Sequence, residues 1–168
     1  QAIENGAAAV LTDQDGHTLM RQSLPEISVA LVVVEDPAAA LASAAALWFE
    51  AQPKKIVAVT GTNGKTSVTH FCRQIWTELE YQAINLGTNG VQGAFTAPLS
   101  YTTPDALLLQ SLLAKAALAG VTHAAIEASS HGLQQRRLDG VKLCAAGFTN
   151  FTQDHLDYHK DFEDYFRA

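Results

Sequence analysis

The stretch Val59-Thr60-Gly61-Thr62-Asn63-Gly64-Lys65-Thr66-Ser67 follows the apolar run 56–59 and precedes a segment with apolar residues at helical spacing. In a strand, loop and helix of this kind, the loop N–H groups and the helix N-terminus attract phosphate oxygens. The Lys65 ammonium adds a positive charge, and the Thr66 hydroxyl can ligate Mg²⁺. The stretch therefore predicts a phosphate-binding loop in an α/β sheet, with ATP or GTP as the ligand.

The loop departs from the usual pattern G-x-x-x-x-G-K-[ST]. The position five residues before Gly64 is Val59, and a glycine, Gly61, lies inside the loop instead. The alternative is a glycine turn that ends a strand, with Lys65 in solvent. We prefer the phosphate-binding interpretation because strand, loop, Gly-Lys-Thr and helix occur in the required order.

Composition places the chain among ordinary globular proteins. Its 168 residues are 48% hydrophobic and 17% charged, with a net charge of −6. The acidic balance disfavours a general affinity for nucleic acid, and no apolar run is long enough to span a membrane. The two cysteines, Cys72 and Cys144, lie in apolar contexts and are expected to be buried thiols of a cytoplasmic protein. We see no signal peptide.

Strands and helices are expected to alternate along most of the chain. We expect strands at 7–11, 29–34, 56–60, 82–86, 122–128 and 143–149, helices at 37–51, 65–79, 104–119, 129–138 and 161–168, a polar turn or loop at 13–24, and an irregular stretch at 87–101. Such alternation predicts a mostly parallel sheet with helices on both faces. Pro53 and two lysines make 51–55 the best linker, so we expect one unit at 1–51 and another at 52–168.

Polar clusters follow three of the expected strands, so parallel strands would bring them to one edge of the sheet. Besides the loop, these are Glu127-Ala128-Ser129-Ser130-His131-Gly132 and the stretch Thr149-Asn150 to His159. Glu127 could hold Mg²⁺ or, alternatively, cap a helix or pair with a cation. Arg136 and Arg137, beside Gln135, could bind a carboxylate or phosphate or simply lie in solvent.

The remaining polar motifs allow more than one interpretation. Asp154, His155, Asp157 and His159 could contact Mg²⁺, phosphate or ribose, or could form a polar loop without a ligand. A zinc site is disfavoured because the glutamate of H-E-x-x-H and nearby cysteines are missing. The segment 101–105 is a helix start, with Thr103 as the N-cap and Pro104 in the first turn.

Together these motifs resemble the Mur ligases. The resemblance rests on Thr60–Thr66, on Thr102-Thr103-Pro104, on Glu127–Gly132, and on Asn150-Phe151-Thr152-Gln153-Asp154-His155-Leu156-Asp157-Tyr158-His159. Within that family the chain is most similar to the MurE type, which adds a diamino acid to UDP-MurNAc-L-Ala-D-Glu in peptidoglycan synthesis. The resemblance implies a cytoplasmic, monomeric ATP-dependent ligase that forms an acyl phosphate, which the amino group of meso-diaminopimelate or L-lysine attacks.

The resemblance also implies a role for each matching residue. ATP phosphates would lie against Gly61, Thr62, Asn63, Gly64, Lys65, Thr66 and Ser67, and Asn150 and Asp154 would line the nucleotide site. Mg²⁺ would be held by Thr66, Glu127 and His155, and the catalytic set would be Lys65, Glu127 and His155. The UDP-muramoyl dipeptide would contact Thr102, Thr103, Ser129, Gln135 and Arg137. Many relatives have asparagine where this chain has Tyr101.

The resemblance further implies that the chain is part of a longer enzyme. Residues 1–51 would end the UDP-binding N-terminal domain, and 52–168 would begin the central ATP-binding domain. The carbamylated lysine of the family and its amino-acid-binding domain would follow Ala168, so this chain alone should be inactive. The alternatives are another ligase of the superfamily, MurF or folylpolyglutamate synthase, and a P-loop module without catalysis. A GTPase is disfavoured because Asn-Lys-x-Asp is missing.

Overall fold

The computed structural model describes residues 2–24 and 26–168 and divides the chain into two compact units, Gln1–Leu41 and Ala42–Ala168. The division falls inside helix α2 (Pro37–Phe49) rather than in the linker expected at 51–55. The second half of α2 belongs to the second unit because Ala42 and Ala45 are buried and the helix packs closely on Gly140, where a Cβ atom would lie 2.6 Å from the Ala46 Cβ.

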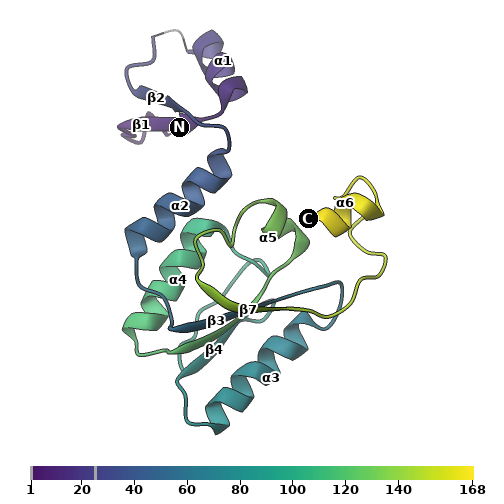
Figure 1. The fold of residues 1–168 in the computed structure, drawn as a ribbon. Helices are drawn as coiled ribbons and strands as arrows, with labels where there is room; N and C mark the ends of the chain where they lie inside the picture. The colour runs from purple at the N-terminus through teal and green to yellow at the C-terminus, as the bar shows by residue number, and fades with distance from the viewer. Residues whose placement is uncertain (1, 25) are drawn as a thin grey trace. The chain divides into compact units, whose positions relative to one another are not determined.

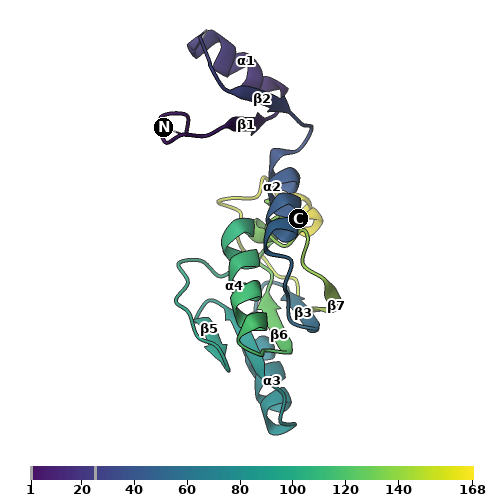
Figure 2. The ribbon, with the colours of Figure 1, turned by 90° about the vertical axis from the view of Figure 1, so that its left-hand side faces the viewer.

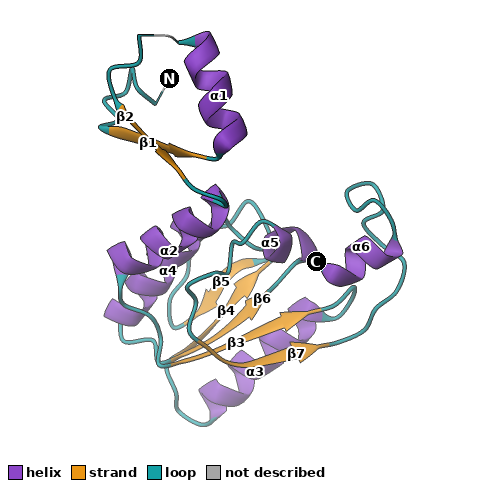
Figure 3. Ribbon diagram, turned by 45° about the horizontal axis from the view of Figure 1, so that its top comes forward, coloured by secondary structure: helices purple, strands orange, loops and turns teal. Residues whose placement is uncertain are grey.

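The first unit is a small α/β structure. Strands β1 (Ala9–Thr12) and β2 (Ala30–Val33) pair in parallel and are joined by helix α1 (Gln14–Ser23) (Figure 3). Our expectation of a turn or loop at 13–24 was wrong. Asp13 caps the helix by accepting a hydrogen bond from Gly16 N at 2.7 Å. Parallel strands also require a crossover connection, which a helix provides.

The second unit contains a five-stranded sheet in the order β5-β4-β6-β3-β7. The strands are β3 (Lys55–Thr60), β4 (Ala83–Gly87), β5 (Gly90–Gly93), β6 (His123–Glu127) and β7 (Leu143–Phe148). All neighbouring pairs are parallel except β4 and β5. The expected mostly parallel sheet is confirmed, but β5 lies in the stretch that we expected to be irregular. It forms a hairpin with β4, which needs no crossover helix and so leaves no periodic signal.

Helices cover both faces of this sheet, as expected (Figures 1 and 2). They are α3 (Lys65–Glu78) and α4 (Ala106–Leu118), whereas α5 (Ser130–Gln134) follows β6 and α6 (Phe162–Arg167) lies beyond β7 in the chain. The connection from β3 through α3 to β4 and the connection from β4 through α4 to β6 run in opposite directions along the sheet. Because such crossovers are right-handed, α3 and α4 lie on opposite faces.

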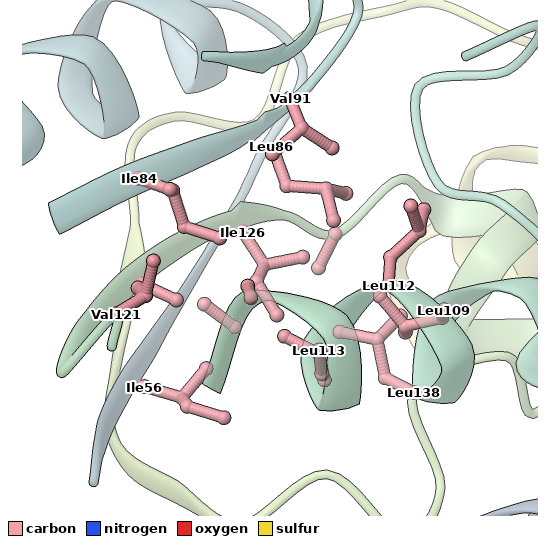
Figure 4. Packing of buried hydrophobic residues seen from close by; sticks show 14 residues of the cluster. Ile56, Ile84, Leu86, Val91, Leu109, Leu112, Leu113, Val121, Ile126 and Leu138 are labelled. Atoms are coloured by element: carbon pink, nitrogen blue, oxygen red, sulfur yellow. The ribbon is translucent and has the colours of Figure 1, made fainter. Parts of the chain in front are cut away.

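The core of the second unit lies between the sheet and α4. Leu109, Leu112 and Leu113 of the helix pack with isoleucines of three strands, Ile56, Ile84 and Ile126 (Figure 4). Each of these six side chains is at least nine-tenths buried. The core therefore fixes the three central strands, two of which, β3 and β6, carry polar clusters at their carboxyl ends.

The edge strand β7 is exposed along its whole length. Cys144 lies on this strand and is exposed, whereas Cys72 on α3 is partly buried. The expectation that both thiols are buried was therefore wrong for Cys144, because a strand at the sheet edge has a neighbour on one side only. Among the described residues, no helix has the length and apolar character needed to cross a membrane.

Candidate active site

A cleft of about 540 Å³ opens at the carboxyl ends of the parallel strands. It brings together residues from the phosphate-binding loop, from the segment before α4 and from the ends of β4 and β6. Its lining comprises Thr62, Asn63, Gly64, Lys65, Thr66, Thr88, Tyr101, Thr102, Thr103, Glu127, Ser129, His131, Arg137 and His155. Eleven of these fourteen were expected from the sequence, the other three being Thr88, Tyr101 and His131.

The phosphate-binding loop depends on two glycines with left-handed backbone. Gly61 has φ of 123° and Gly64 has φ of 87°. A Cβ atom at Gly61 would collide with the Thr149 hydroxyl and the Asn150 backbone, so the loop at Gly61 lies directly against the end of β7. Glycine is required at Gly61 both for its backbone angle and for this close approach.

The Lys65 side chain folds back over the loop. Its ammonium donates hydrogen bonds to the carbonyl oxygens of Gly61, at 2.6 Å, and Thr62, at 2.9 Å. Burial lowers the pKa of Lys65, and the charges of Glu127 and Asp154 oppose that shift. Both bonds are to neutral acceptors, so the charge remains free to attract phosphate oxygens that enter the cleft.

The end of β7 holds the loop in shape. The Asn150 side chain accepts a hydrogen bond from Asn63 N at 3.0 Å and donates one to Asn63 O at 3.0 Å. The Thr149 hydroxyl donates to Asn63 O at 2.7 Å. Asn150, which we expected to line the nucleotide site, therefore supports the loop from outside the cleft.

Glu127 is a buried carboxylate at the end of β6, with only 1% of the residue exposed. Its Oε2 accepts hydrogen bonds from the hydroxyls of Thr66, at 2.9 Å, and Thr88, at 3.3 Å. Its Oε1 accepts one from Thr88 N at 3.0 Å. These hydrogen-bond partners are all neutral, so none of them balances the negative charge of the carboxylate.

This donor set fits Mg²⁺. A carboxylate and a threonine hydroxyl are hard oxygen ligands, and Mg²⁺ usually takes one or two carboxylates together with phosphates and water. The described residues contain no group of three or more His, Cys, Asp or Glu side chains that could hold a metal by themselves. Phosphate oxygens would therefore have to complete the coordination, with His155 at the same cleft.

Thr103 joins three segments at the rear of the cleft. Its buried hydroxyl donates to Glu127 O at 2.8 Å and accepts from Ser129 N at 3.0 Å. The Ser129 hydroxyl donates a further hydrogen bond to the Thr103 hydroxyl at 3.1 Å, and it caps α5 by accepting a hydrogen bond from Gly132 N. Thr103 is not the N-cap of α4, as we expected from the sequence; Asp105 fills that role by accepting from Leu108 N at 2.9 Å.

Arg137 lies at the cleft with neutral partners. Its Nη1 donates to Thr103 O at 2.6 Å, and its Nε and Nη2 donate to the Gln135 side-chain oxygen at 3.1 and 2.6 Å. Its guanidinium carbon lies 5.7 Å from the centroid of the Tyr101 ring. Gln135 does not line the cleft and instead orients Arg137, while donating to the Tyr158 hydroxyl at 2.9 Å. Such a guanidinium is suited to an anionic ligand.

The remaining expected residues lie around the cleft rather than in its lining. Gly61 lines an adjacent cavity of about 230 Å³, to which Lys65 and His155 also contribute. Ser67 is exposed in the first turn of α3. Asp154 is exposed, and its side chain accepts a hydrogen bond from His155 N at 2.9 Å.

Several residues of the site were not found from the sequence. Thr88 directly follows β4, so the rule that ligands bind at strand ends would have found it had that rule been applied to this strand. Tyr165 bonds through its hydroxyl to Thr62 Oγ1 at 3.0 Å, and nothing in its spacing predicts this contact. The contact depends on the path of the chain between β7 and α6.

Comparison with known proteins agrees with the family resemblance that the sequence motifs indicate. Residues 59–168 match the Mur ligase middle domain. A UDP-N-acetylmuramoyl-L-alanyl-D-glutamate–2,6-diaminopimelate ligase from Mesorhizobium japonicum is 51% identical over 99% of this chain and 34% of its own length. The ligase of the same name from Caulobacter vibrioides is also 51% identical, over 98% of this chain and 34% of its own length.

A solved structure of a ligase with that name matches with a TM-score of 0.78 at 32% sequence identity, over 98% of this chain and 32% of that chain. The chain thus spans about a third of the length of the curated relatives that it matches.

Proposed function

The chain belongs to the Mur ligase family, and we propose that the whole protein is an ATP-dependent ligase that adds a diamino acid to UDP-MurNAc-L-Ala-D-Glu. Relatives 51% identical over nearly the whole chain are named as 2,6-diaminopimelate ligases, which supports diaminopimelate over L-lysine. The observation that carries the proposal is the single cleft where Lys65, Glu127 and Arg137 meet. It combines a phosphate-binding loop, a carboxylate for Mg²⁺ and a guanidinium for a second anionic ligand.

We assign the nucleotide to the loop side of this cleft. The N–H groups of 61–67 and the N-terminus of α3 would bind the phosphates of ATP, with Lys65 on their oxygens. Thr66, Glu127 and His155 would hold Mg²⁺, which would neutralise phosphate charge during transfer. The bonds from Asn150 and Thr149 to Asn63 would keep the loop rigid.

The acceptor is assigned to the opposite side. Arg137, oriented by Gln135, would bind an anionic group of the UDP-muramoyl dipeptide, and Thr102, Thr103 and Ser129 would provide hydroxyl contacts. The side-chain carboxylate of the D-glutamate would then face the terminal phosphate of ATP. A carboxylate becomes a good electrophile only after phosphorylation, so the task of the site is positioning and charge neutralisation.

The two parts of the chain would serve different domains. We infer that the first unit belongs to a UDP-substrate domain and the second to the ATP-binding domain, and that the amino-acid-binding domain lies in the part of the relatives that this chain does not cover.

The full-length protein tests the proposal. ADP release is measured with ATP, Mg²⁺ and UDP-MurNAc-L-Ala-D-Glu, with meso-diaminopimelate or L-lysine in separate reactions. We expect release to require the UDP substrate and to be stimulated by diaminopimelate. ATP binding with no stimulation by either amino acid would overturn the proposal.

A further inference from the structure

His159 is a buried polar residue for which the proposed mechanism has no use. Only 1% of the residue is exposed, and its ring stacks on Tyr165 with centroids 5.1 Å apart and planes 28° apart. A hydrogen bond of 2.9 Å joins its Nε2 to the Ser130 hydroxyl. Polar side chains are rarely buried so completely without a structural or functional reason.

The turn that contains His159 holds His155 in a strained backbone. His155 has φ of 54°, in the left-handed region that non-glycine residues seldom adopt. Its carbonyl oxygen accepts hydrogen bonds from Tyr158 N at 3.1 Å and His159 N at 2.9 Å. Such strain persists only where the surrounding structure fixes it.

The His159 side chain connects this turn to both sides of the cleft. Its partner Ser130 begins α5, next to Ser129, which bonds to Thr103. Its stacking partner Tyr165 bonds through its hydroxyl to Thr62 in the phosphate-binding loop. The buried ring therefore connects the turn to the acceptor side of the cleft through Ser130 and to the nucleotide side of the cleft through Tyr165.

We propose that His159 is a positioning residue: its ring, held between Ser130 and Tyr165, keeps His155 directed at the cleft in its strained conformation. The inference rests on the proposed function, in which His155 acts on Mg²⁺ bound with ATP. Without the bond from the ring to Ser130, the turn can relax and His155 no longer stays at the position needed by the metal–nucleotide complex, while the loop that binds the phosphates is unchanged.

The test compares His159→Phe with the unaltered full-length protein. Phenylalanine keeps the ring but loses the bond to Ser130. Calorimetric titration with ADP is done with Mg²⁺ and with EDTA. We expect affinity in Mg²⁺ to fall about tenfold and affinity in EDTA to change less than about twofold. The kcat falls by about the same factor, with the KM for the UDP substrate unchanged. His159→Gln, which can still reach Ser130, recovers part of the loss.

Two further variants keep the test decisive. His123→Phe is the matched control, since His123 also lies among aromatic rings but at the opposite end of β6; it should bind ADP normally. If His159→Phe does not fold, Ser130→Ala removes the same bond from the other side and should give the same selective loss in Mg²⁺. If the folded variants differ from the unaltered protein by the same factor in Mg²⁺ and in EDTA, the inference is overturned. Absence of amino-acid-stimulated ADP release in the unaltered protein would instead refute the proposed function, and the titrations would still judge His159.

Discussion

At the scale of single residues, Gly61 and Gly64 carry the shape of the phosphate-binding loop for different reasons. Both have positive φ, which costs an L-residue roughly 1–2 kcal/mol. A Cβ atom at Gly64 would meet nothing closer than 3.9 Å, whereas one at Gly61 would collide with Thr149 and the Asn150 backbone. We predict that Gly61→Ala lowers the free energy of unfolding by at least about 1 kcal/mol more than Gly64→Ala. Urea denaturation of the two variants measures this, and equal losses would contradict it.

Glu127 is the residue where function and stability should separate. Glutamine has the same shape, and the hydroxyls of Thr66 and Thr88 can turn to accept from its amide. Glu127→Gln removes a buried charge, so we expect the free energy of unfolding to be equal or higher. Affinity for ATP in Mg²⁺ should fall at least about tenfold, because a carboxylate ligand is lost. Calorimetric titration checks this; unchanged Mg²⁺-dependent affinity would refute the assignment.

His123 makes stability depend on pH. Burial lowers its pKa, and the nearby charge of Lys55 lowers it further. The unfolded chain, with an ordinary pKa of about 6.5, therefore binds this proton more readily than the folded chain. The contribution of His123 to the free energy of unfolding is therefore fully present above about pH 6.5, and it decreases as the pH falls below that value. We predict that the unaltered chain loses more unfolding free energy between pH 8 and pH 5 than His123→Phe does. Equal losses in the two proteins would show that His123 does not contribute to the pH dependence of stability.

At the scale of elements, the segment before α4 is fastened to β6 and α5 by one hydroxyl. The Thr103 hydroxyl is buried and makes three hydrogen bonds, whereas the neighbouring Thr102 hydroxyl makes a single exposed bond to Thr88. Thr103→Val should lower the free energy of unfolding by about 1–3 kcal/mol, because it leaves the buried hydrogen-bond partners of the hydroxyl unsatisfied. Thr102→Val, the matched control, should cost less than about 1 kcal/mol. Thermal denaturation of both variants decides, and similar costs would contradict the role given to Thr103.

The elements also show what could be predicted from the sequence. Strands β3 and β6 and helices α3 and α4 were found because their apolar periodicity is strong and their ends carry turn residues. Helix α1 was missed because its segment is polar and was interpreted as a turn or loop, although Asp13 at its start caps the helix. Strand β5 was missed because Gly90–Gly93 has no alternating pattern, and only its pairing with β4 defines it.

The candidate site was predictable in its members but less so in their contacts. The strand-end rule brought Lys65, Glu127 and Ser129 into one cleft, because parallel strands end at one edge. The supporting contacts depend on how loops return to the sheet. Asn150 beneath the loop and Tyr165 against Thr62 are of this kind, and no local spacing encodes them.

At the scale of the whole molecule, the chain covers about a third of the length of its curated relatives. We assign the nucleotide and the acceptor to its cleft, and the amino acid to a further domain. We therefore predict that this 168-residue chain alone forms no amide. Mass spectrometry of a reaction with ATP, Mg²⁺, UDP-MurNAc-L-Ala-D-Glu and diaminopimelate would detect the product. Amide formation by the chain alone would show that the further domain is not needed.

The central claim is that this cleft is the site of an ATP-dependent ligase. The most direct measurement is mass spectrometry of the UDP-linked product made by the full-length protein and by its Glu127→Gln variant, with diaminopimelate as the amino acid. We predict that the unaltered protein yields the UDP-MurNAc tripeptide in equal amount to the ADP released, and that the variant, although folded, yields at least about a hundredfold less. Tripeptide formed at equal rates by both proteins would place the chemistry outside this cleft and contradict the account.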